Sequence, residues 1–259
     1  MKRYLEQRLE KDARHCQIYV YDQLPSTNTT ARELAALGAP DGTVVIAERQ
    51  SAGRGRMSRS FFSPGGTGLY MSVIIRRNLL VQDALKLTTT AAVAVAQAIE
   101  SMGKQVGIKW VNDIYLDKKK VCGILTEGAV VPGSADLDYA VIGIGVNVAF
   151  PQGGFPEELA AIAGSVFGDV SDPYGVRCEL ALNILNRLMT NLNLDDSQVI
   201  HKEYCRRSFV IGKQVTVHRG DDEPYTARVM GIDYDYRLLI RTSDGREAAL
   251  DSGEISIRM

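Results

Sequence analysis

The chain has 259 residues, of which 45% are hydrophobic and 24% are charged, with a formal net charge of -1. This composition is typical of a soluble globular protein with one or two domains, and the absence of a basic excess argues against non-specific nucleic-acid binding. No apolar stretch approaches the roughly 20 residues of a membrane span, and the N-terminus is too charged for a secretory signal, so we expect a cytoplasmic protein.

The cysteines and histidines indicate neither a metal site nor a catalytic triad. The four cysteines are far apart in the sequence, and we expect reduced thiols rather than zinc ligands: Cys16, Cys122, Cys178 and Cys205. The three histidines form no recognisable grouping, so we assign them no role.

The N-terminal part predicts a helix, a strand and a second helix. Residues 2–14 are highly charged with a narrow apolar stripe, which predicts a short amphipathic helix. Residues 17–22 alternate like a strand. Ser26, Thr27 and Asn28, all common N-cap residues, then precede a run rich in Ala, Leu and Glu. They either cap this helix or bind a ligand at its N-terminus.

Residues 47–64, AERQSAGRGRMSRSFFSP, are predicted to form a loop between strands at 43–48 and 68–77. It contains four arginines, two glycines and an aromatic pair: Arg49, Arg54, Arg56, Arg59, Gly53, Gly55, Phe61 and Phe62. Glycines let the backbone approach a ligand closely, and arginine side chains suit phosphate or carboxylate. A solvated surface turn is the alternative. The position between two strands favours an anion-binding loop.

Two strand-like runs follow at 106–117 and 119–130, with a turn between them. Lys109 faces away from the apolar side chains of the first run. A solvated lysine is the ordinary outcome at such a position, and contact with a bound anion is the alternative. We interpret residues 118–120 as a solvated hairpin turn rather than a binding patch.

The remaining pattern is helical first and then consists of short strands. Helical periodicity predicts helices at 83–102, 177–192 and 197–207. Residues 139–148 predict a buried strand in which Gly143 and Gly145 indicate close approach of a backbone or a ligand. From Ile211 onward, five short strands in about 50 residues, with a turn at Gly220 and Asp221, predict a small barrel.

Four ordered motifs, GRGR at 53–56, KWVND at 109–113, GILTE at 123–127 and GIGVN at 143–147, resemble those of biotin protein ligases. The family usually has proline where Val111 stands and tryptophan where Phe61 stands. The resemblance covers nearly the whole chain.

The resemblance implies an α+β fold with a mixed, mostly antiparallel sheet and packed helices, similar to class II synthetases. It implies a catalytic domain at 1–208 and an SH3-like C-terminal β-barrel at 209–259. Residues 2–14 are too few for a winged-helix module, so we expect the class without an N-terminal DNA-binding domain. Neither DNA nor a membrane is an expected partner, and apolar strands at a sheet edge would suit a homodimer.

The resemblance also implies an ATP-dependent, AMP-forming ligase. Biotin's carboxylate attacks the α-phosphate of ATP to give biotinyl-5'-AMP and pyrophosphate. A lysine of a biotin carboxyl carrier protein or domain, in a biotin-dependent carboxylase, then attacks the mixed anhydride. The two anions of the first step repel, so cations and N–H donors must neutralise them. Mg2+ is expected with ATP, bound mainly through phosphates and water, and we assign it no protein ligands.

Arg54 and Lys109 are the predicted catalytic residues. The resemblance implies substrate contacts from Ser26, Thr27, Asn28, Gln50, Gly53, Arg54, Gly55, Arg56, Arg59, Phe61, Tyr70, Lys109, Asn112, Gly123 and Asn147. Ser26, Thr27, Asn28, Gln50 and Arg54 belong to the biotin side, whereas Asn112 and Arg59 belong to the nucleotide side. We expect the arginine loop to move without ligand and to close over the adenylate.

Two alternatives remain. A lipoate ligase runs the same adenylate chemistry on a related fold, but those enzymes lack the glycine-arginine loop. A non-catalytic sensor would bind biotin or its adenylate and act through partner contacts; the intact loop and Lys109 argue against lost catalysis.

Overall fold

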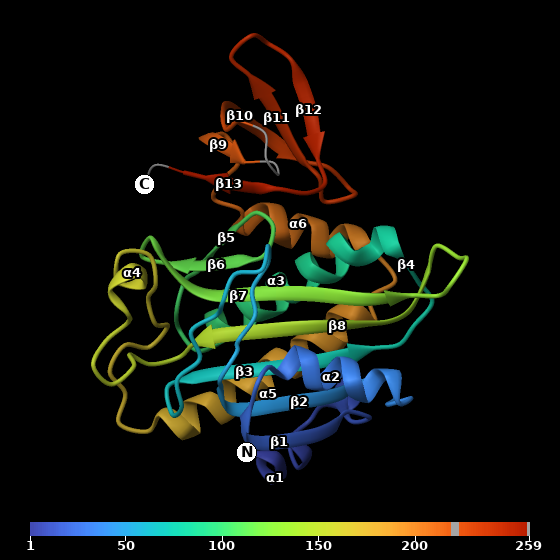
Figure 1. Ribbon diagram of the computed structural model, residues 1–259, viewed down its shortest axis with the longest axis vertical. Coiled ribbons are helices and arrows are strands. Elements are labelled where there is room, and N and C mark those ends of the chain that lie inside the picture. Colours follow the sequence, from blue (N-terminus) through green and yellow to red (C-terminus); the bar gives the residue numbers. More distant parts are fainter. Residues whose placement is uncertain (219–222, 258–259) are drawn as a thin grey trace.

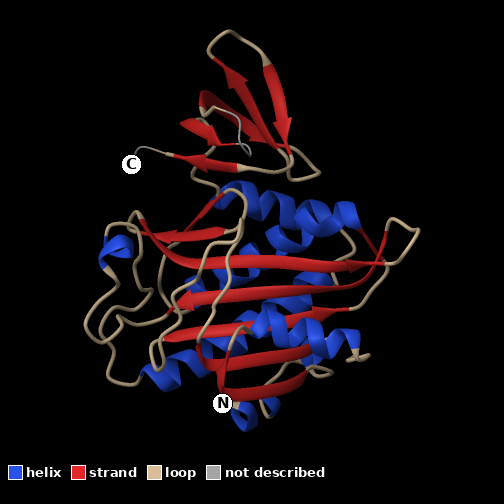
Figure 2. Cartoon of the chain, viewed as in Figure 1, coloured by secondary structure: helices blue, strands red, loops and turns tan. Residues whose placement is uncertain are grey.

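The structure is a computed structural model that describes residues 1–218 and 223–257 (Figure 1). The predicted turn at Gly220 and Asp221 lies outside these residues. The chain forms a large α+β part that ends with helix α6, and a small all-β part that begins with strand β9. The all-β part lies beside α6, at the top of the view in Figure 2.

One eight-stranded sheet forms the centre of the larger part. Its strands are β1 (Gln17–Leu24), β2 (Thr43–Gln50), β3 (Gly68–Ile75), β4 (Leu79–Leu80), β5 (Gly107–Lys109), β6 (Asp113–Leu116), β7 (Lys119–Val130) and β8 (Asp136–Asn147). Their order is β1-β2-β3-β8-β7-β6-β5, and β4 pairs with β8. β1 and β2 run parallel, whereas the other neighbouring pairs are antiparallel. The predicted mixed, mostly antiparallel sheet is confirmed.

Helices cover both faces of this sheet (Figure 1). They are α1 (Lys2–Glu6), α2 (Thr27–Ala36), α3 (Ala84–Ser101), α4 (Glu157–Ala160), α5 (Pro173–Leu192) and α6 (Ser197–Arg207), with 3-10 turns at Lys11–Ala13 and Val81–Asp83. α3 and α5 pack together on one face, and α2 packs on β2, β3 and β8 from the other. None of the described helices is both long and apolar enough to cross a membrane.

Residue alternation along β8 decides what each face of the sheet carries. One set belongs to the main core with α3 and α5: Ala140, Ile142, Ile144 and Val146. On the opposite face Tyr139 and Val141 pack under α2, and Gly143 and Gly145 continue that row. The row therefore changes from bulky side chains to bare backbone at the first turn of α2, which leaves space there for a pocket.

The C-terminal part is a five-stranded antiparallel sheet in the order β12-β11-β10-β9-β13. Its strands are β9 (Gln214–His218), β10 (Tyr225–Ile232), β11 (Leu238–Thr242), β12 (Glu247–Leu250) and β13 (Glu254–Ser256). All five predicted strands are present. Their alternating buried residues, such as Val215 and Val217 of β9, form the interior of the small barrel.

Three local predictions were wrong. The helix expected over 2–14 is broken into α1 and a 3-10 turn. The arginine loop begins at Ser51 because Gln50 still pairs with Leu24 of β1. The run 106–117 is two short strands joined by a tight turn, because Asn112 is held by β7 and Lys109 pairs with Asp113.

Candidate active site

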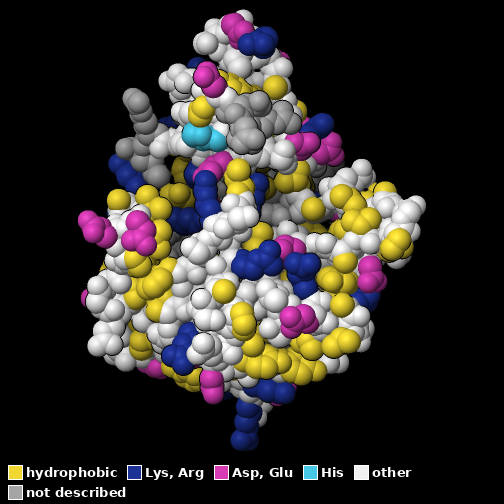
Figure 3. All heavy atoms as spheres, viewed as in Figure 1, with side chains coloured by type: hydrophobic (Ala, Val, Ile, Leu, Met, Phe, Trp, Pro, Cys, Tyr) yellow, Lys and Arg dark blue, Asp and Glu magenta, His cyan; other side chains and the backbone are white. Residues whose placement is uncertain are grey.

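A cavity of about 230 Å³ lies where the open face of β7 and β8 meets the N-terminus of α2 and the arginine loop, residues 51–67. The β5–β6 turn, together with Gly253 and Glu254 at the start of β13, completes its rim. Figure 3 shows a cluster of Lys and Arg side chains near the middle of this face of the molecule.

Two glycines of β8 form the floor of the cavity. A Cβ on Gly143 would lie 2.0 Å from Asn28 Oδ1, and one on Gly145 would lie 2.7 Å from Phe61 Cε1. No larger residue fits at either position without moving these side chains. The groups that approach these glycines are side chains, whereas the sequence predicted a backbone or a ligand.

The Ser26–Asn28 segment turns its polar groups inward instead of capping its own helix. All three residues are buried, and Ser26 stands at the N-cap position without a side-chain capping bond. The Thr27 amide donates to Gln50 Oε1 at 2.8 Å, and the Thr27 hydroxyl lies 3.2 Å from the same oxygen. The capping interpretation therefore leaves these side chains unexplained.

Ser72 of β3 connects this segment to the sheet. Its Oγ lies 2.8 Å from Thr27 Oγ1 and 2.7 Å from Asn28 Oδ1, and it is fully buried. Gln50 extends the network, since its Nε2 donates to Ser63 Oγ at 2.9 Å. Sequence reasoning missed Ser72, although a lone serine in an apolar strand was a usable signal because buried hydroxyls need partners.

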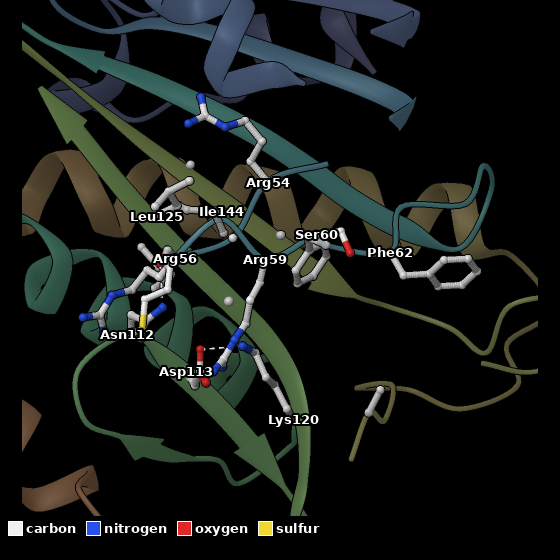
Figure 4. A pocket seen from close by; sticks show the side chains of 18 of the residues that line it. Arg54, Arg56, Arg59, Ser60, Phe62, Asn112, Asp113, Lys120, Leu125 and Ile144 are labelled. Carbon is white, nitrogen blue, oxygen red and sulfur yellow. Dashed lines mark hydrogen bonds and ion pairs between the residues drawn. The ribbon is translucent and has the colours of Figure 1, made fainter. Parts of the chain in front are cut away.

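The three arginines of the loop reach three different elements (Figure 4). Arg54 Nη2 lies 3.0 Å from Glu127 Oε1 of β7. Arg56 donates to Asn112 Oδ1 at 3.1 Å and to the Gly253 carbonyl at 3.2 Å. Arg59 Nη1 donates to Glu254 Oε1 at 2.7 Å.

The last of these contacts ties the loop to the barrel. The hydrogen bond from Arg59 holds the pKa of Glu254 below its ordinary value, more than its partial burial raises it. Glu254 therefore stays ionised at the rim of the cavity, where sequence reasoning had placed no acidic residue.

Two lysines line the cavity beside the β5–β6 turn. Burial lowers the pKa of Lys109, and nearby Asp113 and Glu254 partly oppose that shift. Its Nζ lies 5.9 Å from the centre of the Tyr115 ring. Lys120 Nζ lies 2.7 Å from Asp113 Oδ1. The interpretation of 118–120 as only a solvated turn was wrong for Lys120, because its side chain enters the cavity.

The turn between β5 and β6 is fixed from outside the cavity. Trp110 Nε1 donates to the carbonyl of Tyr236 in the barrel at 2.9 Å, and the Tyr204 hydroxyl of α6 donates to the Val111 carbonyl at 3.0 Å. The Trp110–Val111 peptide bond is cis. Asn112 Nδ2 donates to the Ile124 carbonyl at 2.8 Å. The turn is thus fixed by the barrel, α6 and β7.

An apolar wall closes one end of the cavity. Phe155, Leu159 and Ile162, from the segment around α4, line it together with Phe62. The rings of Phe62 and Phe155 meet edge to face with centroids 6.4 Å apart. Sequence reasoning had given this segment no role.

Most of the predicted site residues meet at this cavity. Those that line it are Ser26, Thr27, Asn28, Gln50, Arg54, Gly55, Arg56, Arg59, Phe61, Lys109, Asn112, Gly123 and Asn147. Gly53 and Tyr70 do not. Gly53 packs against the returning chain, where a Cβ would lie 2.3 Å from the Phe61 carbonyl oxygen. Tyr70 is buried behind Phe61, and its hydroxyl donates to the Pro64 carbonyl at 2.9 Å.

The carboxylates around the cavity do not form a metal cage. Asp113 pairs with Lys120 and Glu254 pairs with Arg59. Across residues 1–218 and 223–257, no three His, Cys, Asp or Glu side chains are grouped as metal ligands.

All four cysteines are free thiols, and burial raises the pKa of Cys16 to about 12.

Two family models match the chain: the biotin/lipoate A/B protein ligase family at 20–147 and the biotin protein ligase C-terminal domain at 210–258. The bifunctional ligase/repressor BirA of Bacillus subtilis is 38% identical over 231 residues, 87% of this chain and 69% of that protein. The biotin–[acetyl-CoA-carboxylase] ligase of Paracoccus denitrificans is 31% identical, over 86% of this chain and 93% of that protein.

A solved structure shares the fold. The biotin protein ligase from Aquifex aeolicus in complex with biotin and ATP has a TM-score of 0.73 and 27% sequence identity, and the match covers 93% of this chain and 98% of that one. The sequence relatives and this shared fold lead to one assignment. The chain belongs to the biotin/lipoate A/B protein ligase family.

Proposed function

We propose that this protein is a biotin protein ligase. It activates biotin with ATP to biotinyl-5'-AMP and transfers the biotinyl group to a lysine of a biotin carboxyl carrier protein or domain. One observation supports this most strongly: a single cavity joins a buried polar end at Thr27 and Gln50, beside Arg54, to a cationic end at Arg56 and Lys120. A ligand with an uncharged polar ring and a carboxylate fits that division.

The first step needs no covalent enzyme nucleophile. Biotin's carboxylate oxygen forms a bond to the α-phosphorus of ATP, and the bond to the departing pyrophosphate breaks. We propose that Arg54 and Lys109 stabilise the charge that collects there, and we add Lys120 because its ammonium group also enters the cavity. Cations held in place before the reaction lower its barrier because they need no reorganisation.

We assign the buried polar end of the cavity to the bicyclic ring of biotin. Ser26, Thr27, Asn28 and Gln50 supply donors and acceptors there, and Phe61 supplies an apolar surface over Gly145. We assign the nucleotide to the side of Arg56, Arg59 and Asn112. Gly55, Gly123 and Asn147 also line the cavity.

Magnesium is part of the proposal as a companion of ATP. Because the cavity carboxylates are already paired with Lys120 and Arg59, the ion would be held through phosphates and water. We route no step through a protein-bound metal.

The second step transfers the biotinyl group. The acceptor lysine's amine attacks the biotinyl carbonyl, AMP leaves, and an amide forms. A mixed anhydride hydrolyses in water, so we propose that the loop from Arg54 to Arg59 closes over the adenylate until the acceptor arrives.

We further propose a catalytic domain at 1–208 and an SH3-like domain at 209–259. The start of β9 at Gln214 and the second family match at 210–258 support this division. The charge balance favours a protein acceptor over DNA. We also propose a cytoplasmic location, which the free thiols support.

A homodimer is a further proposal. β1 lies at the end of the sheet order, and Tyr19 and Val20 on it are 40% and 42% exposed. An exposed edge strand is suited to pairing with a second copy. Light scattering of the purified protein would give its mass in solution; a monomer at all concentrations would contradict the proposal.

The test of function is exchange of labelled pyrophosphate into ATP, with biotin, lipoate and octanoate as parallel acids. Exchange with biotin alone is the expected result. Exchange with lipoate would move the assignment to the lipoate ligases, and no exchange with any acid would favour a non-catalytic sensor. Transfer of biotin to a carrier domain then tests the second step.

A further inference from the structure

Glu127 lies beside the cavity but is not one of its lining residues. It contacts side chains from two separate elements. It lies on β7 with 18% of its side chain exposed, and Arg54 Nη2 is 3.0 Å from its Oε1. Asn28 Nδ2 donates to its Oε2 at 2.9 Å. Arg32, on α2, is more distant at 3.5 Å. One carboxylate therefore joins the arginine loop to the first turn of α2.

Glu127 sets the orientation of the Asn28 amide together with the Leu125 carbonyl, which accepts from the same Nδ2 at the longer distance of 3.3 Å. An ionised carboxylate only accepts hydrogen bonds, so the Asn28 NH2 group must face it. The Asn28 oxygen then faces Ser72 Oγ at 2.7 Å. Because a Cβ on Gly143 would lie 2.0 Å from that oxygen, the amide has little room to relax.

Glu127 also determines where Arg54 lies. In Figure 4 the Arg54 side chain points away from the group formed by Arg56, Asn112, Asp113 and Lys120. Its guanidinium remains at the Asn28 end of the cavity, and 43% of the side chain is exposed. The charge-assisted contact with Glu127 anchors this arginine, because ionised partners form the stronger hydrogen bonds.

We propose that Glu127 is a positioning residue that places Arg54 and the Asn28 amide together at the biotin end of the cavity. A ligand that binds beside Asn28 then meets Arg54 already in place. This inference rests on the proposed function in one respect: biotin is taken as the ligand that binds beside Asn28.

The first test is Glu127→Gln in the exchange assay. We expect the KM for biotin to rise about tenfold, as for loss of one charge-assisted hydrogen bond, and kcat to fall as well, because Arg54 is also a proposed charge stabiliser. Arg32→Gln is the matched control, since it removes the other guanidinium from the same carboxylate; its KM should stay within about twofold. A Glu127→Gln variant with unchanged KM would overturn the proposal.

A double-mutant cycle tests whether Glu127 acts through Arg54. If it does, adding Glu127→Gln to Arg54→Gln should raise the KM for biotin less than Glu127→Gln does alone, because part of its effect is already lost. Fully additive increases would show that Glu127 does not act through Arg54.

A second readout needs no activity. Trypsin should cleave ligand-free Glu127→Gln in the loop faster than the unaltered protein, whereas Arg32→Gln should match the unaltered protein. If Glu127→Gln does not fold, Glu127→Asp keeps the charge but shortens the reach, and the same comparisons apply. Absent exchange in the unaltered protein would contradict the proposed function, whereas equal cleavage rates would contradict the role of Glu127.

Discussion

Lys120 Nζ and Asp113 Oδ1 lie 2.7 Å apart across the paired strands β6 and β7. This contact directs a lysine from an exposed hairpin into the cavity, beside Lys109. The cationic end of the cavity thus has two ammonium groups, of which one is paired and the other is partly desolvated.

Removing either lysine should impair adenylate formation more than folding. We expect Lys109→Ala and Lys120→Ala each to lower the exchange rate about 100-fold, as for loss of one preorganised charge stabiliser. Burial disfavours the charged form of Lys109, so Lys109→Ala should lower the free energy of unfolding by less than about 1 kcal/mol. Lys118→Ala, on the exposed turn, is the control. A loss of several kcal/mol in Lys109→Ala would instead reveal a structural lysine.

The lowered pKa of Lys109 also predicts a pH dependence. If the charged form is needed, the exchange rate should begin to fall on the alkaline side below about pH 10.4, the ordinary lysine pKa. Lys109→Arg should move that limb to higher pH because arginine stays protonated. An alkaline limb that is identical in both proteins would exclude Lys109 as its source.

Gly143→Ala should block the biotin end of the cavity. Its Cβ would overlap Asn28 Oδ1 at 2.0 Å, so Asn28 must leave Ser72 and Glu127. We expect a higher KM for biotin and a destabilisation of about 1–3 kcal/mol from overpacking. Gly231→Ala is the matched control, since a Cβ there meets nothing within 4 Å. Equal KM values in the two variants would argue against the assigned biotin end.

Limited proteolysis tests closure of the arginine loop. Polar contacts from Arg56 and Arg59 hold the loop to Asn112 and Glu254, and the Arg59 contact is exposed. Exposed ion pairs contribute little stability and open readily. Trypsin should cleave the loop in the free protein, and biotin with ATP should protect it. Equal cleavage with and without ligands would contradict closure of the arginine loop over the adenylate.

Acid should loosen the helix that supports the β5–β6 turn. The buried Arg207 of α6 pairs with Glu203 and Glu100, and its hydrogen bond lowers the pKa of Glu203. A lowered folded-state pKa contributes stability above the ordinary glutamate pKa near 4.3. That contribution is lost as pH falls through the lowered value. α6 also carries Tyr204, which holds the turn.

Glu203→Gln should therefore be less stable than the unaltered protein at pH 7, by about 1–2 kcal/mol. The difference should shrink as both are acidified toward pH 3, because protonated Glu203 no longer pairs as an anion. Thermal melts across this pH range measure it. A constant difference at every pH would show that charge is not the cause.

Local patterns predicted most elements because hydrophobic periodicity reflects which side of each element is buried. α6 has its predicted bounds, and all five barrel strands are present. Predictions were wrong where a distant contact overrides the local pattern. The run 106–117 alternates like one strand, but hydrogen bonds from Asn112 to β7 reverse the chain within it.

From its own residues the sequence determined the glycine pair of β8, the arginine loop and the polar residues at the start of α2, because each of these is a property of a few consecutive positions. Only the tertiary structure decided that Lys120, Ser72, Glu127 and Glu254 join them. These four lie on β7, β3 and β13, and their contacts span much of the chain: Arg59 and Glu254 are 195 positions apart. Such contacts exist only after the sheet is paired and the barrel is docked, so no local pattern records them.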